Sequence, residues 1–233
     1  MSSVSEQIRQ LVQDELAQRA NPVDAGPMQA YLKTEMPFYG VKKPGRTAIE
    51  RLLKKRFRLD DRDAWEEAVR ALWALPHREE KYLAIAYAKL HPEHAVPASL
   101  PLFEQLIREG AWWDFVDDVA GNLVGRLWSE HRAWTEERMD RWIDDDDLWI
   151  RRTAILGQLK HKEHTDVARL FRYCRERMHE REFFIRKAIG WALRQYSYTD
   201  PDAVKDFLRA HRDELSGLSY REGAKGLVRK GLM

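Results

Sequence analysis

Apolar residues recur every three to four positions along nearly the whole chain, which is the spacing of amphipathic α-helices. Ser3 with Glu6 forms a capping box at the first helix, and Asn21-Pro22 separates it from a second helix through Tyr31. Residues 37–45 form a loop. Further helices are predicted at 46–57, 62–75, 78–90, 97–109, 112–128, 131–143, 147–159, 165–178, 182–195, 201–212 and 219–230.

Two later helix starts carry local signals. Asp200 precedes Pro201, the combination of an N-cap and a first-turn proline. Ser219 with Glu222 forms a second capping box. No strand longer than a few residues and no linker is apparent, so we predict an all-α fold in a single domain over 1–233.

Two segments of the chain resemble each other at an offset of 35 residues. Trp-Ile-Arg-Arg-Thr-Ala-Ile at 149–155 is similar to Phe-Ile-Arg-Lys-Ala-Ile-Gly at 184–190, and a fainter echo begins at Tyr82. A period of this length built from helix pairs is typical of a HEAT-like α-solenoid. Because the identity is weak, a plain helical bundle is the alternative.

The 35-residue period brings charged residues together. Asp117, Arg152 and Lys187 are spaced by one period, and equivalent positions of successive repeats lie side by side. We therefore expect these three charges to form a row on the inner wall of a curved molecule with a concave basic groove. Trp113 precedes Asp117 by one turn, Trp191 follows Lys187 by one turn, and Arg194 lies three residues beyond.

Charge and cysteine content restrict the class of protein. The net charge is only +2, but residues 42–58 carry eight cations against one anion, which suits a polyanion-binding face; a solvated helix face is the plainer interpretation. A single cysteine, Cys174, excludes a disulfide framework and indicates a reducing compartment. The sequence has neither a signal peptide nor a membrane span, so we expect a cytoplasmic protein. The histidines lack metal-like spacing, and we assign no metal and no cofactor.

A carboxylate among cations requires an explanation. Arginines and lysines in a groove can hold phosphates, and tryptophan rings can contact sugars or bases. The negative charge of Asp117 repels the same phosphates that the cations attract, which suggests that Asp117 has a chemical role. Cleavage of an N-glycosidic bond develops positive charge on the deoxyribose, and a carboxylate and aromatic faces stabilise such a cation. Asp117 could equally be an ordinary surface carboxylate paired with Arg152, and that pairing would keep it ionised.

Five segments in order resemble the AlkD-type DNA alkylation-repair glycosylases, over nearly the full length. They are Pro-Met-Gln-Ala-Tyr-Leu-Lys at 27–33, Leu-Trp-Ala-Leu-Pro at 72–76, Trp-Trp-Asp-Phe-Val-Asp at 112–117, Leu-Trp-Ile-Arg-Arg at 148–152 and Phe-Phe-Ile-Arg-Lys-Ala-Ile-Gly-Trp-Ala-Leu-Arg at 183–194. The last segment is the most specific. The resemblance implies a HEAT-like solenoid that removes cationic N3- and N7-alkylated purines from duplex DNA.

The resemblance also implies roles for individual residues. Asp117 takes the place of the catalytic carboxylate, Trp113 and Trp191 line the sugar, and Arg152 is the groove arginine near the carboxylate and the DNA backbone. The residues expected to contact DNA are Tyr31, Lys43, Arg151, Lys187 and Arg194. Trp112 cannot share a face with Trp113 and is assigned to packing, as are Trp65, Trp73 and Trp142. The acidic run 144–147 departs from what a DNA groove favours.

Three classes of function stay open at this point. The first is a monofunctional glycosylase, a monomer near the nucleoid that uses water as nucleophile and leaves an abasic site. The second is a non-catalytic binder of DNA structure, and the third is a protein-binding scaffold. The presence of Asp117, Arg152, Trp113 and Trp191 favours the first. The sequence leaves the preference among 3-methyladenine, 7-methylguanine and bulky adducts open.

Overall fold

Among the residues that the structure, a computed structural model, describes (3–233), the secondary structure is helical and no strand occurs. This confirms the all-α class and the HEAT-like succession of helices. The contacts divide the chain into two compact units, residues 1–95 and 96–233. The single domain, the curvature and the concave basic groove stay predictions. No helix formed by the described residues is long and apolar enough to cross a membrane.

The described residues of the first unit form five α-helices and a short 3-10 helix, η1 (Pro92–His94). In it α1 packs on α4, and α4 packs on α5. Ser3 is the N-cap of α1, and its hydroxyl accepts a hydrogen bond from the Glu6 backbone, which is one half of the predicted capping box. The core of this unit includes Trp65 and Trp73, both buried as predicted. The helices are α1 (Val4–Gln18), α2 (Pro22–Leu32), α3 (Lys43–Arg56), α4 (Arg62–Trp73) and α5 (Arg78–Leu90).

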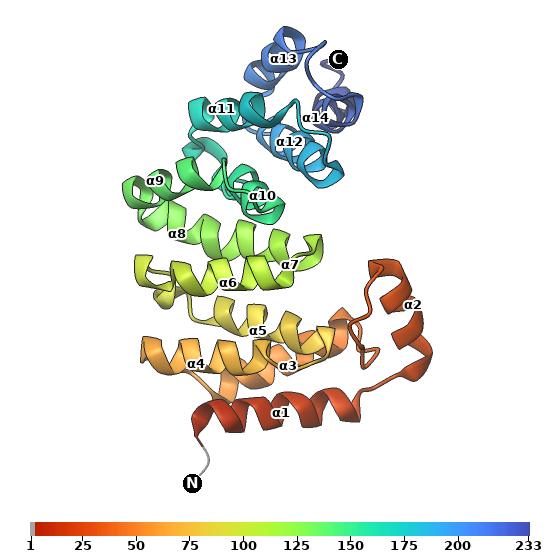
Figure 1. Cartoon of the computed structure of the whole chain (residues 1–233), viewed down its shortest axis with the longest axis vertical. Coiled ribbons are helices and arrows are strands. Elements are labelled where there is room, and N and C mark those ends of the chain that lie inside the picture. The colour runs from red at the N-terminus through yellow and green to blue at the C-terminus, as the bar shows by residue number, and fades with distance from the viewer. Residues whose placement is uncertain (1–2) are drawn as a thin grey trace. The chain divides into compact units, whose positions relative to one another are not determined.

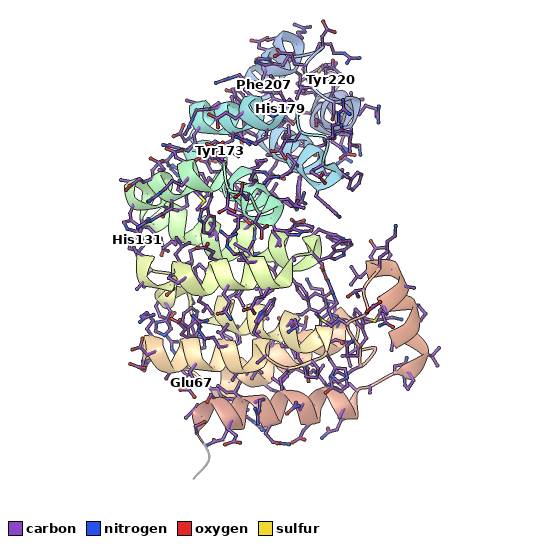
Figure 2. The ribbon with its side chains drawn as sticks, in the orientation of Figure 1. Glu67, His131, Tyr173, His179, Phe207 and Tyr220 are labelled. Atoms are coloured by element: carbon purple, nitrogen blue, oxygen red, sulfur yellow. The ribbon has the colours of Figure 1, made fainter. Side chains whose placement is uncertain are left out.

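The second unit carries the remaining helices, which follow one another in chain order from α6 to α14 in Figure 1. Within it α10 packs on α7 and α12, and α12 packs closely on α14. Tyr173, labelled in Figure 2, joins α11 to α9 by donating a 2.6 Å hydrogen bond to Asp140. Trp142 is buried as predicted. The helices are α6 (Leu100–Gly110), α7 (Trp113–Asp118), α8 (Gly125–Glu130), α9 (Arg132–Trp142), α10 (Leu148–Leu156), α11 (Val167–Arg177), α12 (Phe183–Tyr196), α13 (Pro201–Ala210) and α14 (Gly217–Arg229).

Two predicted local features are wrong. The helix predicted at 112–128 is interrupted by a π-helical turn, η3 (Val119–Val124), which separates α7 from α8. Ser219 and Glu222 do not cap α14, because that helix begins earlier and its N-cap is Ser216, whose hydroxyl accepts from the Ser219 backbone at 3.0 Å. Both Ser219 and Glu222 lie inside the helix and are buried. Asp200, by contrast, caps α13 as predicted, accepting from the Ala203 backbone at 2.9 Å.

Candidate functional site

Two short helices of the second unit carry the centre of the site. The chain enters α7 through Trp112, whose extended backbone precedes the first helical turn. Trp113 and Asp117 are then four residues apart in the same helix, so their side chains lie on one face. The facing helix α10 is capped by Asp147, which accepts from the Trp149 backbone at 2.7 Å. That cap fixes where α10 begins and therefore which of its residues faces α7.

Arg152 of α10 forms a two-pronged pair with Asp117. Its Nε donates to Oδ1 at 2.7 Å and its Nη2 to Oδ2 at 2.9 Å, while Nη1 donates to the backbone oxygen of Phe184 on α12. The Arg152 side chain is 4% exposed and that of Asp117 is 15% exposed. The planar guanidinium leaves the carboxylate little freedom to rotate. The pair joins the three helices α7, α10 and α12.

The carboxyl of Asp117 experiences opposing influences. Burial raises its pKa above the usual aspartate range, the hydrogen bonds and charge of Arg152 oppose the rise, and the neighbouring Asp114 and Asp118 add to it. Because a guanidinium stays charged at any physiological pH, its pairing with Asp117 favours the ionised form of the carboxyl group. The three carboxylates of α7 concentrate negative potential at this point of the unit.

An aromatic cluster adjoins Arg152 through Phe184, whose ring centre lies 5.9 Å from the guanidinium carbon. Trp112 lies 5.3 Å from Phe184 and 6.0 Å from Trp149, and the last two rings are 4.8 Å apart. Trp112 therefore packs between helices, as assigned, although it is half-buried rather than fully buried. This cluster holds the backbone of Phe184 where Arg152 reaches it. Trp113 and Trp191 keep part of their surface exposed, as residues that contact a ligand must.

The 35-residue register extends one repeat further than the sequence pattern indicated. Asp117 and Arg152 meet directly, but Lys187 pairs with Glu222, 35 residues beyond it, at 3.2 Å. Arg194 donates to the other oxygen of Glu222 at 2.9 Å. The sequence contained this signal, since adding one more period to Lys187 gives Glu222. Because Ser219 and Glu222 also have the spacing of a capping box, the sequence pattern alone does not identify the pairing of Glu222 with Lys187.

Arg151, expected to contact DNA, is engaged inside the protein. It binds both oxygens of Glu180 at 3.1 and 3.0 Å and the backbone oxygens of Asp145 and Asp146 at 2.6 and 2.9 Å. Its side chain is only 13% exposed. Four of its five guanidinium N–H groups have acceptors within the protein, so we do not propose Arg151 as a DNA contact. It ties the acidic loop before α10 to the loop before α12.

The same loop explains the acidic run at 144–147. Asp145 accepts two hydrogen bonds from Arg108 of α6, at 3.1 and 2.7 Å, and Asp144 pairs with Arg177 of α11. Together with the cap formed by Asp147, these contacts make the run a connector between helices. Much of its charge is balanced within the unit.

The two site residues of the first unit are strongly exposed. Tyr31, on the last turn of α2, is 75% exposed, and Lys43 begins α3 at the start of the basic run. The segment between α2 and α3 is held by Glu79, a fully buried carboxylate that accepts hydrogen bonds from the backbone nitrogens of residues 39–41 at 2.9 to 3.1 Å. Gly40 in this segment has φ +82°, a conformation that favours glycine. Glu79 was not predicted, because nothing in its helix pattern distinguishes it.

The π-helical turn directly after Asp118 is the other unpredicted feature. Asn122 donates to the backbone oxygen of Asp118 at 3.0 Å and to its side chain at 2.6 Å, and Asn122 in turn accepts from Lys160. Gly125 then approaches α10 so closely that a Cβ there would lie 2.6 Å from the Gly157 oxygen. π-Turns are frequent near functional sites. No three His, Cys, Asp or Glu side chains in residues 3–233 are placed to hold a metal ion.

Comparison with known proteins finds a matching family and a similar solved structure. The model of a family described as DNA alkylation repair enzyme matches residues 12–227. A solved structure titled "Predicted DNA alkylation repair enzyme from Enterococcus faecalis" is similar, with 31% sequence identity and a TM-score of 0.83. The match covers 91% of this chain and 98% of the other. Among curated proteins none matches.

Proposed function

Because the chain belongs to the DNA alkylation repair enzyme family, we propose that it is a monofunctional DNA glycosylase that excises cationic N3- and N7-alkylated purines from duplex DNA. The substrates are 3-methyladenine and 7-methylguanine, and the product is an abasic site. The observation that carries this proposal is the Asp117 carboxyl group, fixed by two hydrogen bonds from Arg152 one helical turn from Trp113.

The proposed reaction breaks the bond between C1′ of the deoxyribose and the purine nitrogen. The bonding electrons leave with the alkylated base, which becomes neutral, while positive charge develops on the sugar. Asp117 stabilises that charge, and the faces of Trp113 and Trp191 contribute through their negative quadrupoles. Water adds to C1′ and releases one proton to the solvent, which leaves a hydroxyl on C1′. No lysine nucleophile is needed, so no strand cleavage follows.

Arg152 acts through Asp117 rather than on DNA. It is almost completely buried, and its donors are directed to Asp117 and the Phe184 carbonyl. A bidentate partner holds the carboxylate in one orientation, so no reorganisation is needed when charge develops. Arg152 is thus a positioning residue.

Duplex DNA is the proposed partner, and the exposed cations are its proposed contacts. Lys187 and Arg194 belong to the second unit, and Lys43 and Tyr31 to the first. Lysine and arginine contacts to phosphate are largely independent of base sequence. A protein that recognises lesions by their reactivity needs no more base-specific contact than this.

The test is release of the free base. Purified protein is incubated with duplex DNA that carries 7-methylguanine or 3-methyladenine, and the released bases and abasic sites are quantified by chromatography. Release above the spontaneous rate, with equal numbers of abasic sites and no strand breaks, supports the proposal. Duplex binding without base release would favour the non-catalytic binder, and absence of both would favour the scaffold.

A further inference from the structure

We propose that Glu222 is a built-in competitor for DNA phosphate: in the free protein its carboxylate occupies cations that a phosphate must take over. The cations are Lys187, Arg194 and Lys225. The inference rests on the proposed function, because it requires that these residues meet the DNA backbone.

The three cations converge on a single buried carboxylate. Glu222 Oε1 accepts from Lys187 at 3.2 Å and also from Lys225, and Oε2 accepts from Arg194 at 2.9 Å. Glu222 is 9% exposed, whereas the side chains of Lys187, Arg194 and Lys225 are 37%, 28% and 54% exposed. The anion is therefore inside and the cations form the outer layer.

Close packing of α12 on α14 keeps the carboxylate at this position. A Cβ on Gly190 would lie 2.5 Å from Cβ of Glu222, so only glycine lets the two helices approach this far. Gly190 lies midway between Lys187 and Arg194 in α12. In addition, Ser219 donates to the Arg186 backbone oxygen at 3.0 Å, one turn before Glu222. The packing therefore fixes the backbone position from which the Glu222 side chain reaches the two cations.

The cluster is charged in a way that suits a second anion. Three cations around one carboxylate leave a net charge of +2, and the cations keep exposed surface. Burial pushes the pKa of Glu222 upward, but the hydrogen bonds and charges of Lys225 and Lys187 outweigh it and lower that pKa. The carboxylate is therefore ionised at neutral pH and competes as a full charge.

This arrangement changes what salt does to binding. A free lysine that neutralises a phosphate releases about 0.9 of a counterion from duplex DNA. A lysine that must first leave Glu222 exposes a carboxylate that takes up a cation from solution. Fewer ions are then released overall, and the protein holds undamaged duplex more loosely than its exposed cations suggest.

The experiment measures affinity of the full chain for undamaged duplex over a series of salt concentrations. Glu222→Gln keeps the shape and removes the charge, and we expect about fivefold tighter binding, as for one like charge removed a few ångströms from a phosphate. The dependence of log affinity on log salt should steepen by up to about 0.9 for each cation released. Unchanged or weaker binding by a folded Glu222→Gln protein overturns the inference.

Glu214→Gln is the charge-matched control. Glu214 is exposed and pairs with His211 rather than with the cluster, so it changes the net charge equally. Its affinity should stay within about twofold of wild type, because an exposed charge outside the contact is screened by salt. Equal tightening by both variants would show an effect of overall charge and overturn the inference.

Lys187→Gln tests the same idea without altering Glu222, should Glu222→Gln fail to fold. An unpaired lysine that contacts a phosphate contributes about 0.9 to the slope of log affinity against log salt. Because Lys187 is already paired with Glu222, its loss should reduce that slope by much less. A reduction by the full amount overturns the inference. Failure of the wild type to bind duplex would refute the proposed function as well, whereas duplex binding with unaltered Glu222→Gln affinity refutes only the competitor.

Discussion

Replacing Asp117 by Asn is the most direct test of the chemistry at the α7–α10 contact. The substitution keeps the side-chain size and removes the charge that Arg152 holds between its Nε and Nη2 atoms. The carboxylate is proposed to favour the sugar cation over the ground state, so its loss should slow the chemical step rather than substrate binding.

The expected loss of excision rate is that of removing one fixed charge beside the reacting sugar. Removal of one preorganised electrostatic group costs about 2.7–4 kcal/mol of activation free energy, or roughly 10²- to 10³-fold in rate. Spontaneous depurination sets a floor, because a cationic purine is already a good leaving group. Stability should fall as well, since Arg152 is left buried without its anion, a loss that reaches about 3–5 kcal/mol in fully buried pairs. The partial exposure of Asp117 and the remaining bond to Phe184 make the loss smaller here.

The assay is single-turnover release of 7-methylguanine and 3-methyladenine at saturating enzyme, at a temperature well below the melting point of the variant. Duplex affinity is measured in parallel and should be unchanged or slightly higher, because an anion has been removed. Asp118→Asn is the matched control, since it removes a neighbouring carboxylate of the same helix that binds Asn122 instead. Release at the wild-type rate by folded Asp117→Asn would show that the carboxylate is not catalytic.

Three further outcomes are expected. Excision by the wild type should slow on acidification, at a pH above the ordinary aspartate pKa of about 3.9. The reason is that burial raises the pKa of Asp117 and only its ionised form stabilises the sugar cation. A rate that falls only at or below that pH contradicts this. Trp113→Ala and Trp191→Ala should each slow single-turnover release by about 3- to 30-fold, less than Asp117→Asn, and an equal loss would mean that the rings have another role. Gly125→Ala should lower the free energy of unfolding by about 1–3 kcal/mol, because its Cβ would meet a backbone oxygen at 2.6 Å. Gly121→Ala, with nothing within 4 Å of its Cβ, should leave the melting temperature nearly unchanged, and similar melting of the two variants would refute this packing argument.

The helices were predictable because their apolar faces repeat over many residues. The helix predicted at 78–90 coincides with α5 at both ends, and the 35-residue period correctly placed Asp117 opposite Arg152. Both results depend on local spacing and on the regular stacking of repeats, which the sequence contains directly.

The remaining features depend on contacts between segments that no local pattern records. Arg151 and Arg152 are adjacent in sequence and alike in charge. Arg152 nevertheless pairs with Asp117, whereas Arg151 pairs with the loop residue Glu180. Glu222 lies at the period of the repeat, but its spacing from Ser219 also fits a helix cap, and local chemistry alone does not choose between them. The apolar spacing of the π-turn does not differ from that of an ordinary α-helical turn, so the sequence pattern could not reveal it.

The π-turn at 119–124 has a consequence for how the two ends of this helical segment are aligned. Each residue of an α-helix advances about 100° around the axis, so an inserted residue rotates everything after it relative to everything before it. Asp117 lies before the turn and meets Arg152, whereas Gly125 lies after it and meets the Gly157 backbone. The turn thus lets the direction of the Asp117 side chain and the packing of Gly125 be set independently within one helical segment. A single-residue deletion there would force a choice between them.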